Sequence, residues 1–171
     1  MTGLLFISGI PTKYITSVVI LAVSNNILNL AEVTLISQGT EISRSSLEFT
    51  LSSTWPDCSW HQQSGPCTAS HCNDGLVSTI CASLDGGAKL SIQLSVPTPV
   101  DQIVIYNRDD CCQDRVNGAT VATYLNGAVQ WSATIPYTSA LSYVFNTGKL
   151  LSIQISLFAK HCPCLSWIAL S

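Results

Sequence analysis

Charged side chains are scarce in this sequence. Asp, Glu, Lys and Arg together make up only 10% of the 171 residues, whereas about a quarter is usual for a globular domain. The seven Lys and Arg residues are scattered along the chain, so no basic cluster is present to attract nucleic acid, and we expect no nucleic-acid partner. A polar but weakly charged composition rich in Ser and Thr favours an extracellular β protein over a cytosolic helical one.

Long apolar runs are also missing. The stretch at residues 14–23 contains Thr16 and Ser17 and is shorter than the roughly 20 residues that a membrane-spanning helix needs. We therefore expect no membrane insertion. Two interpretations of this stretch stay open. Its β-branched residues favour a buried strand, while Lys13 before it fits the apolar part of a signal segment.

Helical periodicity is absent apart from a turn near residues 26–30, and a period of two takes its place. Residues 45–53 and 88–96 alternate apolar with polar side chains, which predicts strands with one buried face. Further strands are expected at residues 14–23, 30–37, 100–107, 119–125, 128–135 and 142–146. The predicted fold is an all-β antiparallel sandwich of the jelly-roll type, with an immunoglobulin-like sandwich as the alternative.

The chain has eight cysteines, an even and high number that predicts disulfides formed in an oxidising compartment. Four of them lie in a long loop expected at residues 55–84. We pair Cys58 with Cys67 and Cys72 with Cys81 as short local links, although four cysteines allow three connectivities.

The two ends of the chain are interpreted separately. Residues 1–13 are an unassigned N-terminal extension, and residues 149–171 are a C-terminal extension in which 150–158 alternate well enough for an extra strand. The chain is therefore interpreted as one module of a larger protein or assembly. Cys162 and Cys164 bond to each other or stay reduced; a zinc site that uses them with His161 is the alternative.

Residues 106–115 are the most informative part of the chain. They follow a clear strand and concentrate five ionic residues out of seventeen in the whole chain. Arg108 and Arg115 carry planar guanidinium donors that suit the paired hydroxyls of a sugar. Asp109 or Asp110 can orient them through bidentate ion pairs. The alternative is a purely structural network of arginines and aspartates.

The same segment contains two adjacent cysteines, Cys111 and Cys112. Adjacent cysteines bond to each other only by distorting the intervening peptide, and the resulting ring presents a flat sulfur face. The alternative is that each pairs with a cysteine elsewhere. A third hypothesis makes Asp109, Asp110 and Asp114 catalytic carboxylates, but neighbouring arginines lower carboxyl pKa values and so disfavour a general acid. We expect no enzyme activity.

The pattern Arg-x-Asp-Cys-Cys-x-x-Arg, within NRDDCCQDRVNGA at residues 107–119, resembles the binding loop of F-type lectins (fucolectins). These belong to the galactose-binding-like jelly rolls that also include discoidin domains. Residues 29–33 (NLAEV) are similar to the opening strand of such domains, and residues 73–75 (NDG) to a loop that precedes a cysteine. The resemblance implies one jelly-roll domain at residues 14–148.

The resemblance also implies roles for the loop residues. Arg108 and Arg115 would donate hydrogen bonds to fucose- or galactose-like sugars, Asp110 would orient them, and Cys111 and Cys112 would pack against the sugar. The family has a histidine where this chain has Ala82. The alternative function is therefore a structural or adhesion module that has lost sugar binding.

The resemblance further implies a structural calcium ion near Asn73 and Asp74. Calcium binds six to eight oxygens, and Asp74 can supply a carboxylate. The family's next ligand position is occupied here by Leu76, which cannot coordinate a metal. A simple turn is the alternative, because Asn-Asp-Gly suits it.

Our sharpest prediction is that Cys111 and Cys112 form a disulfide at the tip of the loop. The strand before them ends near Tyr106, and the other six cysteines can pair without them. Flanking arginines favour thiolates, which oxidise readily. A ring this small closes almost no chain, so its contribution to stability should be small.

Overall fold

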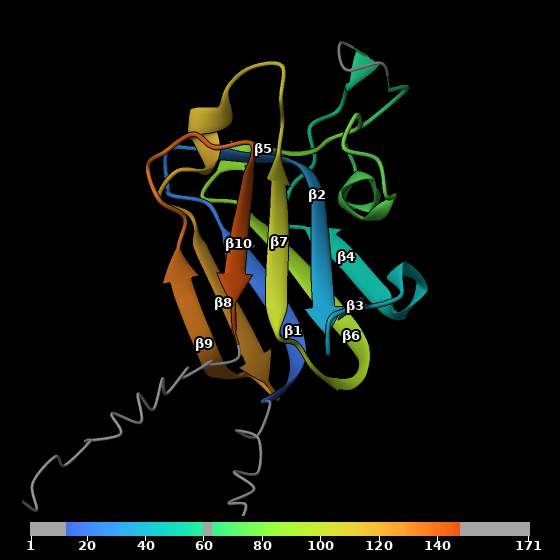
Figure 1. Ribbon diagram of the computed structural model, residues 1–171. Helices are drawn as coiled ribbons and strands as arrows, with labels where there is room; N and C mark the ends of the chain where they lie inside the picture. The colour runs from blue at the N-terminus through green and yellow to red at the C-terminus, as the bar shows by residue number, and fades with distance from the viewer. Residues whose placement is uncertain (1–12, 60–62, 148–171) are drawn as a thin grey trace, which may run out of the picture.

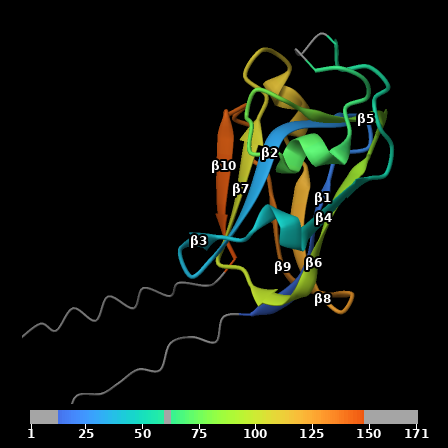
Figure 2. The same cartoon turned by 90° about the vertical axis from the view of Figure 1, so that its right-hand side faces the viewer.

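The computed structural model describes residues 13–59 and 63–147. Within these ranges the strands form two antiparallel sheets that pack face to face (Figure 1). The turned view in Figure 2 shows them as two layers. The all-β antiparallel sandwich predicted from the sequence is confirmed. In the described part of the chain, no helix is long and apolar enough to cross a bilayer.

The first sheet has the strand order β4-β6-β1-β8-β9. Its strands are β4 (Leu47–Leu51), β6 (Lys89–Pro99), β1 (Tyr14–Leu21), β8 (Thr120–Leu125) and β9 (Ala128–Thr134). The second sheet has the order β10-β7-β2-β3, and β5 also pairs with β2. Its strands are β10 (Ser142–Asn146), β7 (Gln102–Asn107), β2 (Ile27–Ser37), β3 (Thr40–Glu41) and β5 (Cys81–Gly86). Short 3-10 helices cover Arg44–Ser46 (η1), Ala69–Asn73 (η3) and Gln113–Val116 (η4).

The chain crosses repeatedly between the two sheets, as the predicted jelly roll requires. Two details differ from the prediction. Strand β2 already begins at Ile27, where a turn was expected. Strand β5 lies in the segment that was predicted as a loop, and its burial pattern runs from three buried to three exposed residues without alternation. No period of two was therefore visible there.

The main core lies between the sheets and is built mostly from inward-facing residues of the longer strands. On β2 the core residues are Leu28, Leu30, Val33 and Leu35, all at most 1% exposed. The step from Leu30 to Val33 breaks the period of two because the pairing of β2 with β7 shifts register there. Trp131 packs against this core and contacts Phe145 edge to face at 5.8 Å between ring centroids.

A second apolar cluster lies outside the main core and consists of Ala31, Cys58, Cys67, Ile80 and Ala82, with Trp55 and Tyr106 packed against it. Disulfides join Cys58 to Cys67 and Cys72 to Cys81, the pairing expected from the short spacings. The Cys72–Cys81 bond links the segment between β4 and β5 to strand β5, and the Cys58–Cys67 bond closes a loop within that segment. The predicted terminal extensions and the expectations for Cys162 and Cys164 lie outside the described residues, apart from Lys13.

Candidate functional site

The arginine- and cysteine-containing loop is held at one end of the sandwich by Asn107, the last residue of β7. Its side-chain nitrogen donates to the backbone oxygens of Gln113 at 2.9 Å and Ala140 at 3.0 Å. Its side-chain oxygen accepts a hydrogen bond from the backbone N–H of Arg108 at 3.0 Å. Both ends of the loop are thereby anchored to the sheet. Figure 1 shows this loop above β7.

Arg108 and Asp110 form a bidentate ion pair inside the loop. Nε and Nη2 of Arg108 donate to the two Asp110 carboxylate oxygens at 2.6 and 2.5 Å. The Arg108 side chain is only 2% exposed, whereas that of Asp110 is 42% exposed. Burial acts to lower the pKa of Arg108, but the hydrogen bonds and charge of Asp110 outweigh it and raise that pKa. Arg108 is therefore a charged and fixed group.

Arg115 has a different environment. It lies on η4 and is half-buried, and within the described ranges it has no ion-pair partner. Asp110 thus pairs with Arg108 but not with Arg115, although the resemblance implied that it orients both. Arg115 keeps a guanidinium that can donate to a ligand.

The predicted disulfide between Cys111 and Cys112 is wrong for this structure. The two sulfur atoms are 2.7 Å apart, compared with about 2.05 Å for a disulfide bond, and both residues are free thiols. Closing the ring would require a distorted intervening peptide. The sulfurs instead share a hydrogen bond, and Cys112 adopts a left-handed conformation with φ 60°.

The thiol chemistry also differs from the expectation. The hydrogen bond with Cys112 and partial desolvation raise the pKa of Cys111, and the opposing effect of Arg108 is smaller. The flanking arginine therefore does not make Cys111 a stabilised thiolate. A positive φ in a residue other than glycine is uncommon and is concentrated at functional sites, which directs attention to this loop.

A pocket of about 360 Å³ opens beside the loop. It brings together all the loop residues that the sequence singled out for sugar binding, along with residues from two strands and from the disulfide-linked segment. The lining residues are Ile27, Asn29, Trp55, Ala82, Arg108, Asp110, Cys111, Cys112 and Arg115. A smaller hollow of about 190 Å³ between β4 and β6 has Glu48 as its single charged side chain.

Asn29 is a pocket residue whose role the sequence did not predict. It lies on β2 and is 1% exposed, and neither its side-chain nitrogen nor its oxygen has a hydrogen-bond partner among the described residues. The sequence signal was an amide between apolar neighbours, Leu28 and Leu30. This pattern indicates that Asn29 faces away from the core side of the strand, but it does not indicate that a pocket lies there.

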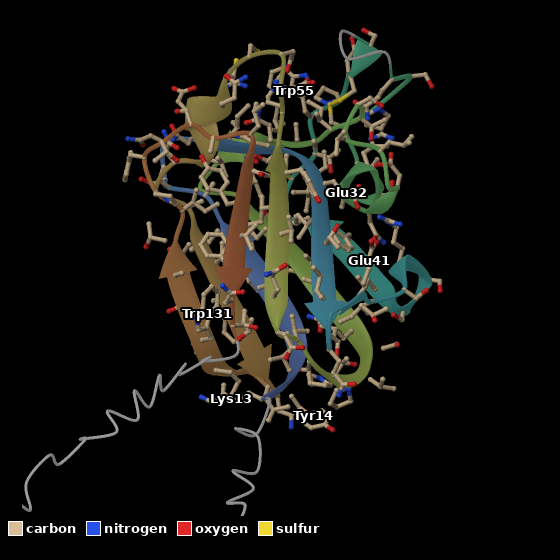
Figure 3. All side chains as sticks on the ribbon, viewed as in Figure 1. Lys13, Tyr14, Glu32, Glu41, Trp55 and Trp131 are labelled. Atoms are coloured by element: carbon tan, nitrogen blue, oxygen red, sulfur yellow. A yellow bond between two sulfur atoms is a disulfide. The ribbon has the colours of Figure 1, made fainter. Side chains whose placement is uncertain are left out.

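Trp55 supplies part of the apolar wall of the pocket. It is half-buried and lies at the same end of the sandwich as the loop (Figure 3). A ring of backbone hydrogen bonds holds it: Trp55 N–H donates to Ala82 at 2.8 Å, Ala82 N–H to Cys67 at 3.1 Å, and Cys67 N–H to Trp55 at 2.9 Å. Its backbone is therefore fixed relative to β5.

The side chains expected to hold calcium make contacts within the protein itself. One Asp74 oxygen accepts from the Leu76 N–H at 2.8 Å and the other from the Thr79 hydroxyl at 2.7 Å. Asn73 donates to the backbone oxygen of Arg44, and only its own side-chain oxygen lacks a partner among the described residues. The positively charged Arg44 lies against the same turn. Within the described ranges, no three His, Cys, Asp or Glu residues are grouped to hold a metal.

Comparisons with protein-family models, with curated proteins and with solved structures found no match to this chain.

Proposed function

We propose that this protein is a non-catalytic carbohydrate-binding module. The observation that carries the proposal is the pocket itself. A fixed guanidinium, a half-buried second guanidinium and a buried amide line it together with an indole ring and two sulfur atoms. Sugars need both halves of such a site, because each ring has hydroxyl groups at its edge and apolar C–H faces.

The size and chemistry of the pocket support a small polar ligand. Its volume of about 360 Å³ lies near the lower end of the roughly 300–1,000 Å³ typical of small-molecule sites, which suits a terminal sugar. Arg115 offers planar donors to neighbouring hydroxyls, and Trp55 with Ile27 offers apolar surface to a C–H face. The left-handed Cys112 and the anchored loop preorganise the site, which lowers the cost of ordering on binding.

A hydrolase is less well supported. Asp110 accepts hydrogen bonds from Arg108 at both oxygens, so it is poorly placed to donate a proton to a substrate. Asp109 and Asp114 are exposed.

The two disulfides support an extracellular, secreted or cell-surface location, because such bonds persist in oxidising compartments.

A glycan array tests the proposal. Wild-type protein should bind a subset of fucosylated or galactosylated glycans, and Arg115→Ala should weaken that binding by about tenfold or more, because it removes charged hydrogen-bond donors. Arg115→Lys should restore little of it, since an ammonium group lacks the planar fork. Lys89→Ala, an exposed residue on β6, is the matched control and should bind like wild type.

The second candidate is a structural or adhesion module that keeps the fold without sugar binding. The observation that favours it is Ala82, which lines the pocket with a methyl group where the resembled family has a histidine. Wild-type protein that binds no glycan across a broad array of animal, plant and algal glycans would support this candidate and overturn the first.

A further inference from the structure

We infer that Asn29 is a specificity-determining residue of the pocket. Its side-chain amide forms hydrogen bonds with a pair of neighbouring hydroxyls on a sugar. This inference rests on the proposed function and goes beyond it, because it assigns a further polar anchor to β2 in addition to the arginine loop. It also offers a substitute for the contact that Ala82 cannot make.

The strand geometry directs Asn29 away from the main core. Its neighbours Leu28 and Leu30 are fully buried between the sheets, and successive side chains of a strand point to opposite faces. Asn29 therefore faces the outer side of the second sheet, where it stands opposite Ala82 of β5 in the strand pairing. Ala82 carries only a methyl group, and both residues line the pocket.

The backbone around Asn29 is irregular on both sides. The pairing of β2 with β5 shifts register between Ile27 and Asn29, and the pairing with β7 shifts between Leu30 and Glu32. The N–H of Leu28 donates to the side chain of Ser83 at 2.8 Å instead of to a backbone oxygen. Such irregularities reorient side chains and are frequent beside binding and active sites.

The energetics indicate that Asn29 does not serve folding alone. A buried side-chain amide is normally hydrogen-bonded, and one without a protein partner destabilises the fold. Both polar atoms of Asn29 lack such a partner within the described residues, so exchanging the assigned oxygen and nitrogen would not change this conclusion. An apolar residue of similar volume would suit this position better if packing were its only role.

The chemistry of the amide defines the ligand class. Asn29 presents one acceptor and two donors on a rigid planar group. A vicinal diol on a pyranose can donate one hydroxyl to the oxygen and accept at the other from the nitrogen. Arg115 and Arg108 face the same cavity and bring positive charge to further oxygens. We therefore expect a terminal hexopyranose with two free neighbouring hydroxyls.

The test compares binding and stability in the same variants. Asn29→Ala and Asn29→Leu are measured against wild type on a glycan array, and then by titration calorimetry with the glycan that wild type binds best. Each should lose affinity by about tenfold or more. The alanine variant adds no bulk, so a loss in both cannot be explained by steric blocking. The control is Asn146→Leu, an exposed asparagine at the opposite end of the second sheet, which should bind like wild type.

Thermal unfolding separates recognition from a structural role. Asn29→Leu should melt at the wild-type temperature or above it, because it removes an unpaired buried amide. Binding by Asn29→Ala at wild-type affinity would overturn this inference while leaving the proposed function in place. A marked drop in the melting temperature of Asn29→Leu would also overturn it and would make Asn29 structural. If wild type binds no glycan, the proposed function and this inference both fail.

Discussion

Replacing Glu32 with glutamine should remove most of the pH dependence of stability between pH 5 and pH 8. Glu32 lies on β2 (Figure 3) and is 2% exposed. One carboxylate oxygen accepts from the Gly75 N–H at 3.1 Å, and the other lies 3.6 Å from Nε of Arg44. Arg44 is shared with Glu41, whose carboxylate it contacts at 2.7 Å.

Burial raises the pKa of Glu32 to about 7, and the Gly75 hydrogen bond and Arg44 only partly offset this effect. The folded protein therefore holds a proton on Glu32 more tightly than the unfolded chain does, whose carboxyl has a pKa near 4.5. Stability should be highest below about pH 4.5 and fall as the pH rises to about 7. The difference corresponds to at most about 3 kcal/mol.

The measurement is urea unfolding at pH 5, 6, 7 and 8 under non-reducing conditions. Wild type should lose about 2–3 kcal/mol across this range, whereas Glu32→Gln should vary much less and exceed wild type at pH 8. Glu48→Gln, an exposed carboxylate on β4, should follow wild type. Wild-type stability that stays flat or increases from pH 5 to pH 8 would refute the reasoning.

Two further predictions concern the cysteines. The double variant Cys111→Ser with Cys112→Ser should shift the melting temperature little, because these exposed or half-buried thiols form no cross-link. The same variant should weaken any sugar binding. A large loss of stability would instead show that the loop has a structural role. Replacing both Cys72 and Cys81 with alanine should lower the free energy of unfolding by about 3 kcal/mol, measured with urea. The bond joins residues nine apart, and closing a loop of about ten residues removes that much entropy from the unfolded chain. An unchanged unfolding midpoint would contradict this prediction.

The sandwich could be predicted because its signal is local. Alternation over residues 88–96 and 45–53 specifies strands within a few positions of the chain. Strand β5 could not be predicted in this way. The disulfide-linked segment covers it, and its own sequence shows no alternation of apolar and polar residues. Its residues Cys81, Ala82 and Ser83 are all buried, and only the folded chain shows what covers them.

The sequence predicted only the part of the candidate site that lies on the arginine-containing loop. Arg108, Asp110 and Arg115 are close in sequence, so their spacing indicates a common loop. Asn29 and Trp55 come from distant segments and reach the pocket through strand pairing and the backbone ring with Ala82. The predicted sulfur bond failed for a different reason, because adjacency in sequence brings two thiols near each other but does not supply the backbone geometry for bonding.

The ring of hydrogen bonds that joins Trp55, Cys67 and Ala82 has a consequence for how the protein matures. One half of the pocket is formed by β2, β5 and the arginine-containing loop. The other half includes Trp55, whose segment is closed by the bond between Cys58 and Cys67. A newly made chain in a reducing compartment would thus carry the polar half of the pocket without its fixed apolar wall. Completion of the pocket is therefore coupled to formation of the bond between Cys58 and Cys67.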